Sequence, residues 1–249
     1  KAGFASEDSL CLGDLLNGKD SSKTKNGVFN KWFWNFGDAG TASLQNPTHR
    51  YSTPSINTIT FFAQTDLGCY TDTIKKQIEV FAYPVISAGP DLFVLDDGQK
   101  KIQSAATGRI ISYTWTPSIY LSDTTILQPT IIKPKEDTYY YLAVKGRGAC
   151  TSKDTLFIVS LAMPKPPNTF TPNGDGINDT WEIKYLDQYE GCVIEVYTST
   201  GQLLYNNTGY TKPWDGNYKG SPVPSGTYYY VIDPKNGRKK IAGYVTILR

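Results

Sequence analysis

Two segments of the chain repeat one pattern of residues at one spacing. In the first segment Cys69 follows Trp34 by 35 residues, and in the second segment Cys150 follows Trp115 by 35 residues. A glycine turn precedes each cysteine, and a similar pair then opens an alternating stretch, Asp72-Thr73 or Asp154-Thr155. The offset of 81 residues between the copies is longer than a solenoid repeat and typical of tandem β-sandwich domains.

The fold that this repeat predicts is a pair of packed sheets with a tryptophan between them. A large ring suits the ~10 Å gap between two sheets. The chain has 18 Tyr, 22 Gly and 15 Pro but a single Met, which favours strands and turns over helices. We therefore expect an all-β chain of three tandem Ig-like β-sandwich domains, at residues 1–83, 84–162 and 163–249.

A proline-rich segment, Met163-Pro164-Lys165-Pro166-Pro167, marks the last boundary, and Pro84 lies near the first. Proline has no amide hydrogen to donate to a strand ladder, and it favours extended polyproline geometry. We expect the segment to act as a semi-rigid spacer between the second and third domains.

The balance of charge argues against partners that are held by bulk electrostatics. The chain has 25 Lys and Arg against 23 Asp and Glu, so we expect neither nucleic acid nor an anionic membrane surface as a partner. No window reaches the ~18 apolar residues that a membrane helix needs. No signal peptide opens the chain, so we expect it to begin as a mature protein or as a piece of a longer one.

The sequence offers little for catalysis. Its single histidine, His49, lies in an Asn-Pro-Thr-His segment, where we expect a structural hydrogen bond and not a general base. Nucleophile-elbow, zinc-helix and phosphate-loop motifs are missing. Two carboxylates would suffice for a glycosidase, but the candidates all lie in glycine turns: Asp38, Asp175, Asp179 and Asp215. We expect the chain not to be an enzyme.

The first domain contains two motifs, Trp34-Asn35-Phe36-Gly37-Asp38-Ala39-Gly40 and Asn46-Pro47-Thr48-His49-Arg50-Tyr51. Through them, residues 1 to about 82 resemble the polycystic-kidney-disease (PKD) domain of surface proteins. Members of that family usually have a glycine where this chain has Ala39.

Residues 168 to 249 contain four motifs in order: Thr171-Pro172-Asn173-Gly174-Asp175-Gly176-Ile177-Asn178-Asp179, Trp214-Asp215-Gly216, Pro224-Ser225-Gly226-Thr227-Tyr228-Tyr229-Tyr230 and Gly243-Tyr244-Val245-Thr246-Ile247-Leu248-Arg249. The set resembles the type B, or gliding-motility-associated, C-terminal sorting domain of Bacteroidetes proteins exported by the type IX secretion system. Where that family often reads Asn-Arg-Trp-Gly, this chain has Thr198-Ser199-Thr200-Gly201, so no role of the Arg-Trp pair is carried over.

The second domain resembles the Ig-like repeats that accompany such sorting domains. The residues that carry this resemblance are Ala88-Gly89-Pro90-Asp91, Trp115-Thr116-Pro117 and Asp137-Thr138-Tyr139.

These resemblances imply a secreted protein whose last domain directs type IX secretion and attachment to the cell surface at the outer membrane. They imply two partners, the type IX machinery and an outer-membrane β-barrel of the PorP/SprF-like family. The first two domains would be stalk modules of a gliding-motility adhesin. The alternative is the accessory tail of a secreted polysaccharide-degrading enzyme, whose Ig-like domains bind a surface glycan. A catalytic domain upstream of Lys1 would favour that alternative.

Cys11 and Cys69 fall in one domain, and family resemblance supports a disulfide between them. Closing this loop of 58 residues would stabilise the fold by roughly 4 kcal/mol in the chain-entropy model, and it implies an oxidising compartment. Cys150 and Cys192 lie in different domains, and a strand of about eight residues after Cys150 carries the chain roughly 26 Å away. We expect both of them to be free thiols.

Residues 171–182 have the spacing of a calcium loop. Aligned on that template, the candidate ligands are Asn173, Asp175, Asp179 and Glu182. Thr171 stands at the first position, where an acid is expected, and no flanking helices are predicted. The other interpretation is a tight turn held by Asx hydrogen bonds and glycines, and the sequence leaves both open.

The chain closes on an alternating stretch, Ile241–Leu248, which predicts the last strand of the third domain. At a sheet edge, its unpaired amides could pair with a partner, and Arg249 could form charge-assisted bonds. We therefore expect a partner to dock on the residues of this strand: Gly243, Tyr244, Val245, Thr246, Ile247, Leu248 and Arg249.

Overall fold

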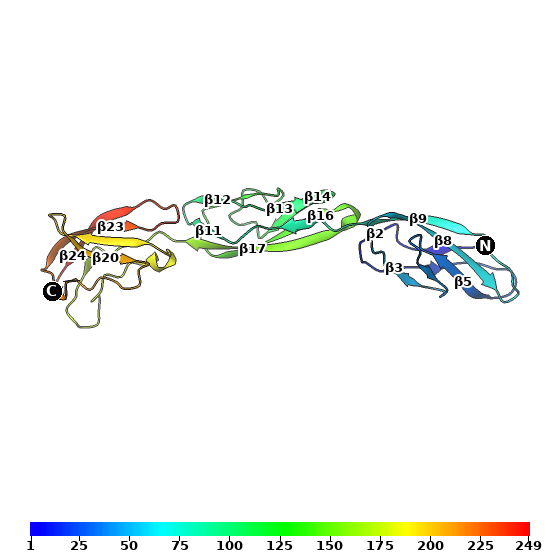
Figure 1. Cartoon of the computed structure of the whole chain (residues 1–249), viewed down its shortest axis with the longest axis horizontal. Coiled ribbons are helices and arrows are strands. Elements are labelled where there is room, and N and C mark those ends of the chain that lie inside the picture. The colour runs from blue at the N-terminus through cyan, green and yellow to red at the C-terminus, as the bar shows by residue number, and fades with distance from the viewer.

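The computed structural model describes the whole chain, Lys1–Arg249, and arranges it as three β-rich domains in a row (Figure 1). The amino terminus lies in the domain at one end of the row, and the carboxyl terminus lies in the domain at the other. Each domain has a buried hydrophobic cluster, and that of the third domain extends across the joint to Leu161 of the second. The expected fold class, an all-β chain of tandem Ig-like sandwiches, is confirmed. None of the helical segments has the length and hydropathy needed to span a membrane.

The first domain is built on a five-stranded sheet in the order β2-β9-β8-β5-β6. These strands are β2 (Ser9–Cys11), β5 (Phe29–Asn35), β6 (Thr41–Ala42), β8 (Ile56–Thr65) and β9 (Ile74–Phe81). Two short pairs complete the domain, β1 (Phe4–Ala5) with β4 (Lys19–Asp20) and β3 (Leu16–Asn17) with β7 (Thr48–His49). Buried and partly exposed residues alternate along β8, because successive side chains of a strand point to opposite faces.

The second domain repeats this plan on a four-stranded sheet in the order β11-β17-β16-β14. The strands are β11 (Leu92–Leu95), β14 (Ile110–Thr116), β16 (Thr138–Gly146) and β17 (Thr151–Leu161). The short pairs are β10 (Val85–Ser87) with β13 (Ala105–Thr107) and β12 (Gln99–Lys101) with β15 (Thr130–Ile132). A 3-10 turn, η1 (Arg147–Ala149), joins β16 to β17.

The third domain has a five-stranded sheet in the order β18-β24-β23-β19-β20. The strands are β18 (Thr169–Phe170), β19 (Val193–Tyr197), β20 (Leu203–Thr208), β23 (Gly226–Asp233) and β24 (Ile241–Ile247). A short pair, β21 (Asn217–Tyr218) with β22 (Ser221–Pro222), and a 3-10 turn, η2 (Leu186–Gln188), complete it.

The two tryptophans of the sequence repeat lie where the repeat predicts. Trp34 is 3% exposed and Trp115 is 1% exposed, each in the core of its domain. Each indole N–H donates to a backbone carbonyl, Trp34 to Leu44 at 3.0 Å and Trp115 to Ile126 at 3.1 Å. The rings therefore fill the interior without leaving their polar atom unpaired.

One topological feature is common to all three domains. A short early strand pairs in parallel with the last strand, as in β2–β9, β11–β17 and β18–β24. The last strand also pairs antiparallel with the strand before it. As a result, the early strand ends beside the point where the last strand ends. The turn before the last strand lies at the opposite end of the domain.

The expected Cys11–Cys69 disulfide and the expected free thiol at Cys150 are both wrong. Cys11 bonds to Cys150 of the second domain, with 5.5 Å between the Cα atoms. Cys11 ends β2 opposite Phe81, the last residue of β9, whereas Cys69 lies in the turn before β9. The eight residues of β9 separate these ends by roughly 26 Å, and a disulfide needs Cα atoms within about 7 Å. Cys69 is free and exposed, and Cys192 is free and buried, as expected for Cys192.

The disulfide closes a packed joint between the first and second domains. The Arg147 guanidinium lies 5.7 Å from the centre of the Phe81 ring. Gly148 has a φ of +67°, and a Cβ on it would lie 2.2 Å from a carbon of that ring. Only glycine allows this approach. The Tyr83 hydroxyl adds a 3.1 Å hydrogen bond to Asp14.

Non-reducing peptide mapping of the recombinant chain Lys1–Arg249 should recover Cys11 and Cys150 as one linked pair of peptides. Cys69 should react with an alkylating reagent in the folded protein because it is exposed, and Cys192 only after denaturation because it is buried. A linked Cys11–Cys69 pair would contradict the joint.

The joint between the second and third domains is centred on Arg238, whose side chain is 5% exposed. Its Nη2 donates to Asp96 Oδ1 at 2.8 Å and to the Leu161 carbonyl at 3.1 Å. Its Nη1 lies 3.2 Å from Asp97 Oδ1, and its Nε donates to the Tyr189 hydroxyl at 2.7 Å. Arg238 thus joins the turn before β24 to the turn after β11.

The proline-rich linker is held to the third domain by hydrogen bonds, more firmly than a semi-rigid spacer would be. The Ala162 N–H donates to Gln188 Oε1 at 3.1 Å, and its carbonyl accepts from the Tyr189 hydroxyl at 2.7 Å. Lys165 has an amide hydrogen between its prolines and donates it to the Lys184 carbonyl at 3.0 Å. The chain is therefore fastened to the third domain at Ala162, just before the linker, and at Lys165 within it.

Replacing Arg238 by Met should loosen the second joint. Removing one partner of a buried ion pair costs about 3–5 kcal/mol. The partial exposure of Asp96 and Asp97 lowers the expected cost to about 2 kcal/mol. Hydrogen exchange of the peptide around Ala162 should then be roughly thirty-fold faster. The control is Lys235→Met in the same turn, which removes an exposed pair with Asp233 and should leave that exchange unchanged. Equal exchange in both variants would show that Arg238 does not hold the joint.

Candidate functional site

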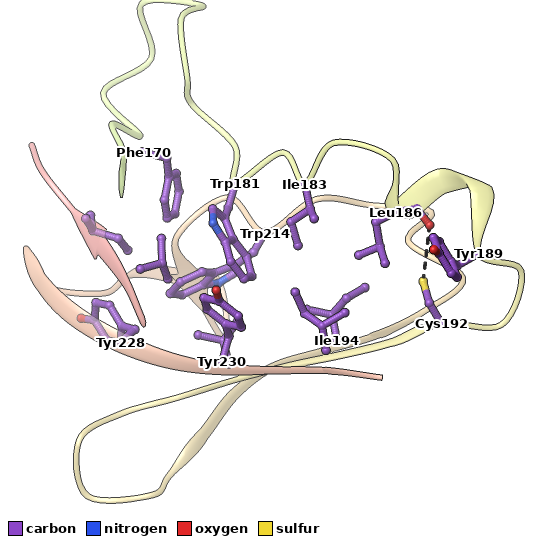
Figure 2. Packing of buried hydrophobic residues seen from close by; sticks show 14 of the residues in the cluster. Phe170, Trp181, Ile183, Leu186, Tyr189, Cys192, Ile194, Trp214, Tyr228 and Tyr230 are labelled. Atoms are coloured by element: carbon purple, nitrogen blue, oxygen red, sulfur yellow. Dashed lines mark hydrogen bonds between the residues drawn. The ribbon is translucent and has the colours of Figure 1, made fainter. Parts of the chain in front are cut away.

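Aromatic residues that belong to the sequence motifs or flank them meet in the core of the third domain (Figure 2). The Trp181 N–H donates to the Trp214 carbonyl at 2.8 Å. The centre of the Trp214 ring lies 5.6 Å from that of Phe170 and 5.5 Å from that of Tyr228. The Trp181 ring lies 4.9 Å from Tyr230. All five rings are buried, so the motifs and the residues that flank them build the core that positions the surrounding loops.

The last strand, β24, is not the free edge that the sequence suggests. One side pairs with β23 along the whole strand. The other side pairs with β18, where Thr169 and Phe170 lie opposite Thr246 and Ile247. The Leu248 N–H also donates to the Phe170 carbonyl at 3.2 Å. The parallel strand, here β18, thus covers the end of β24. Only the first part of β24 is left for backbone pairing with a partner.

The terminal Arg249 turns its guanidinium onto its own domain. Nε donates to the Pro172 carbonyl at 3.3 Å, Nη2 donates to the Gly216 carbonyl at 3.1 Å, and Nη1 donates to the Val223 carbonyl. A guanidinium is a planar fork of five donors, so it can hold several acceptors at once. This group thus fastens three loops around the aromatic core, and a bond from Arg249 to a partner stays a prediction.

Asp179 organises the loop of residues 171–182. Its Oδ1 accepts from the Asn173 N–H at 2.9 Å and from the Gly174 N–H at 2.7 Å. Its Oδ2 accepts from the Gly176 N–H at 2.8 Å. The bonds from Gly174 and Gly176 hold the pKa of Asp179 below its ordinary value of 3.8, with a further contribution from Asn173.

The remaining expected calcium ligands also have partners within the loop. Asn173 Nδ2 donates to Asp175 Oδ2 at 2.9 Å, and the Asp175 N–H donates to Asn173 Oδ1 at 3.0 Å. Glu182 instead lies 3.5 Å from the Thr180 hydroxyl. No group of three or more His, Cys, Asp or Glu side chains is placed to hold a metal ion. The geometry is that of Asx turns, and calcium would have to displace the N–H groups that already point at these oxygens.

His49 has the structural surroundings that its motif predicts. Its Nε2 lies 2.8 Å from Asp38 Oδ2, and its ring stacks on Phe36 with 4.2 Å between the centres. Burial opposes ionisation of Asp38, but the bonds from His49 and the Gly40 N–H outweigh it and lower the pKa of this carboxyl. The pair thus ties the turn between β5 and β6 to β7.

The outward face of the third domain carries a row of tyrosines that the sequence analysis missed. Tyr197 of β19 lies opposite Tyr229 of β23, which lies opposite Tyr244 of β24. Tyr229 is 50% exposed and Tyr244 is 53% exposed, whereas their neighbours Tyr228 and Tyr230 are buried. The sequence pointed only to Tyr244 as a docking residue, as part of the expected docking strand. The other members of the row were missed because strand register decides which tyrosines line up.

Acid should open the 171–182 loop only at a pH below the ordinary pKa of an aspartate. A carboxyl whose pKa is lowered by folding contributes stability that is present above its unfolded pKa, here 3.8, and lost as the pH falls through the folded value. In an NMR titration, the amide shifts of Gly174 and Gly176 should therefore stay native down to about pH 4 and change below it. In Asp179→Ala they should be non-native throughout. A transition well above pH 4 in the native protein would show that these bonds are not formed.

Two parts of the chain match known families. Residues 164–247 match the CHU_C Type IX secretion signal domain, and residues 4–80 match the PKD domain. These are non-catalytic types of module. No curated protein is similar enough to match.

Several solved structures are similar in fold. The PKD1 domain of the Vibrio cholerae metalloprotease PrtV is 24% identical, with a TM-score of 0.29 over 32% of this chain and 93% of its own. The titin I-band fragment I67–I69 is 11% identical, with a TM-score of 0.43 over 99% of this chain and 97% of its own. A C-terminal 282-residue intimin fragment, solved with the intimin-binding domain of its translocated receptor, is 12% identical, with a TM-score of 0.46 over 70% of each chain.

The two family matches agree with the sequence motifs and with the first and third domains of the structure. A type IX secretion signal implies export from the cell and an interaction with the type IX machinery. The chain therefore carries a PKD domain and a CHU_C type IX secretion signal domain, and it belongs to a protein secreted by the type IX system.

Proposed function

We propose that the first two domains are stalk modules of an adhesin-like protein of gliding motility, and that the third domain attaches this stalk to the cell surface. The observation that carries the proposal is the pair of closed joints. The Cys11–Cys150 bond holds the first joint, and the buried Arg238 holds the second. The three domains extend in a row with the termini in opposite end domains (Figure 1). A stalk needs closed joints, because domains on free linkers would reorient independently.

In this proposal the third domain docks on an outer-membrane β-barrel of the PorP/SprF-like family. Val245 and Ile247 are buried in the core, so only the outward residues of the 243–249 segment can meet a partner. Tyr244 and Leu248 are both about half exposed, and Tyr229 extends their surface across the sheet. Tyrosine is enriched at protein interfaces because it combines a large apolar ring with a polar hydroxyl.

The full chain with Tyr229→Ser and Tyr244→Ser should still be exported but should leave the cell surface. Loss of two central aromatic contacts is expected to lower the attached fraction at least roughly ten-fold. Immunoblots of surface and medium fractions measure this. The matched control is Tyr139→Ser with Tyr141→Ser, which changes two outward tyrosines of the second domain that are 58% and 51% exposed. If the first variant, shown to be folded by circular dichroism, stays attached like the control, the tyrosine row is not the docking surface.

A second candidate function, the glycan-binding tail of a polysaccharide-degrading enzyme, is favoured by one surface of the first domain. Phe33 and Phe62 stack on its outward face with 4.6 Å between the ring centres. They line a groove of about 440 Å³ together with polar residues, among them Asn35 and Thr60. Ring faces beside amide and hydroxyl groups suit a sugar, which has apolar faces and hydroxyl edges. A catalytic domain elsewhere in the parent polypeptide would favour this candidate over the adhesin.

A further inference from the structure

Both joints between domains use the same two topological positions. In the first joint, Cys11 ends β2, and the next residue, Leu12, donates its N–H to the last carbonyl of β9 at 2.8 Å. In the second joint, Leu95 ends β11, and the next residue, Asp96, donates its N–H to the last carbonyl of β17 at 3.0 Å. The end of the early strand is thus the position that each domain offers to the domain that follows it.

The following domain contacts this position with the turn before its own last strand. Cys150 lies in the turn between β16 and β17, and Arg238 lies in the turn between β23 and β24. Cys150 bonds to Cys11, and Arg238 pairs with Asp96. One joint is therefore covalent and the other ionic, but the places in the fold are the same.

Cys69 occupies this turn position in the first domain. It lies between β8 and β9, which correspond to β16 and β17 in the shared topology. It follows its core tryptophan, Trp34, by the same 35 residues that separate Cys150 from Trp115. A glycine with positive φ precedes each cysteine, Gly68 at +80° and Gly148 at +67°. Cys69 is thus the counterpart of the cysteine that forms the first joint.

The chain also enters the first two domains by the same path. The Ala2 N–H donates to Asp72 Oδ1 at 3.0 Å, and the Ala88 N–H donates to Asp154 Oδ2 at 2.7 Å. Both alanines are buried and both precede a glycine. Before Ala88, the Pro84 carbonyl accepts from the hydroxyl of Ser152, two residues after Cys150, at 2.6 Å.

The two counterpart turns differ in how they are covered. In the second domain, Phe81 packs on the turn, and Cys150 is 1% exposed. In the first domain, Cys69 is exposed, and three apolar residues around it are each more than 60% exposed: Val28, Leu67 and Tyr70. Val28 belongs to this end because its N–H donates to Asp66 of the turn at 3.0 Å. The end of the first domain that carries Cys69 thus exposes a thiol and an apolar surface, the two components of the joint between the first and second domains.

We propose that Cys69 forms a disulfide with a further β-sandwich domain of the parent polypeptide, which precedes Lys1 and packs on this end. The partner cysteine would end the short strand that pairs in parallel with the last strand of that domain, as Cys11 does. The bond forms when two thiols give up two protons and two electrons to an oxidised disulfide oxidoreductase, which becomes a dithiol. The inference extends the stalk beyond the proposed function and does not depend on how the third domain docks.

Non-reducing peptide mapping of the native protein, taken from the surface of its host and alkylated before digestion, tests this. Cys69 should be recovered in a disulfide with a peptide from upstream of Lys1, beside the Cys11–Cys150 pair. Recovery of Cys69 as an alkylated free thiol would overturn the proposal. So would a bond between two copies of Cys69, which would appear as a dimer that disappears on reduction.

Substitutions in the host sharpen the test. In Cys69→Ser, one upstream cysteine that resists alkylation in the native protein should become fully alkylated. The matched control, Cys192→Ser, removes the other free thiol and should leave every disulfide unchanged. Export of Cys69→Ser to the surface should be normal, which separates this proposal from the docking of the third domain. An unchanged set of alkylated upstream cysteines in Cys69→Ser would contradict the bond.

Discussion

The parallel pair between an early strand and the last strand closes each domain, and the arrangement of the whole chain depends on it. This pair sets the end of the early strand beside the exit of the chain. Residues at that end, Cys11 in the first domain and Asp96 in the second, therefore face the next domain. The turn before the last strand lies at the far end of each domain and meets the domain before it. Two short-range contacts, Cys11–Cys150 and Arg238–Asp96, follow from this geometry.

The two joints hold the domains by different physics. The disulfide is independent of salt and sensitive to reductant, whereas the Arg238 contacts are ionic, and their partners Asp96 and Asp97 are partly exposed. The third domain adds a second arginine with an internal role, since Arg249 ties three loops together. Arg249 is thereby part of the fold of the secretion signal domain, and the outward tyrosines of this domain stay exposed.

The fold class and the core tryptophans could be predicted from the sequence, because strand alternation and the Trp34 and Trp115 spacing are local signals. The disulfide could not, because membership of one domain says nothing about the ends at which Cys11 and Cys69 lie. That depends on the parallel pairing of β2 with β9. The internal bonds of Arg238 and Arg249 could not be predicted either, since each arginine acts on carbonyls or carboxylates that are distant in sequence. For the 171–182 loop, the residues that cluster could be predicted, whereas the hydrogen bonds that favour Asx turns over calcium ligands depend on the folded geometry.

Small-angle X-ray scattering of the oxidised full chain tests most directly whether closed joints hold the three domains in a row. The account predicts scattering from one elongated particle that agrees with the arrangement in Figure 1. Reduction and alkylation of Cys11 and Cys150 should then broaden the distribution of end-to-end distances while each domain stays folded. An oxidised chain that already scatters as a broad ensemble, with bent and extended members alike, would contradict it.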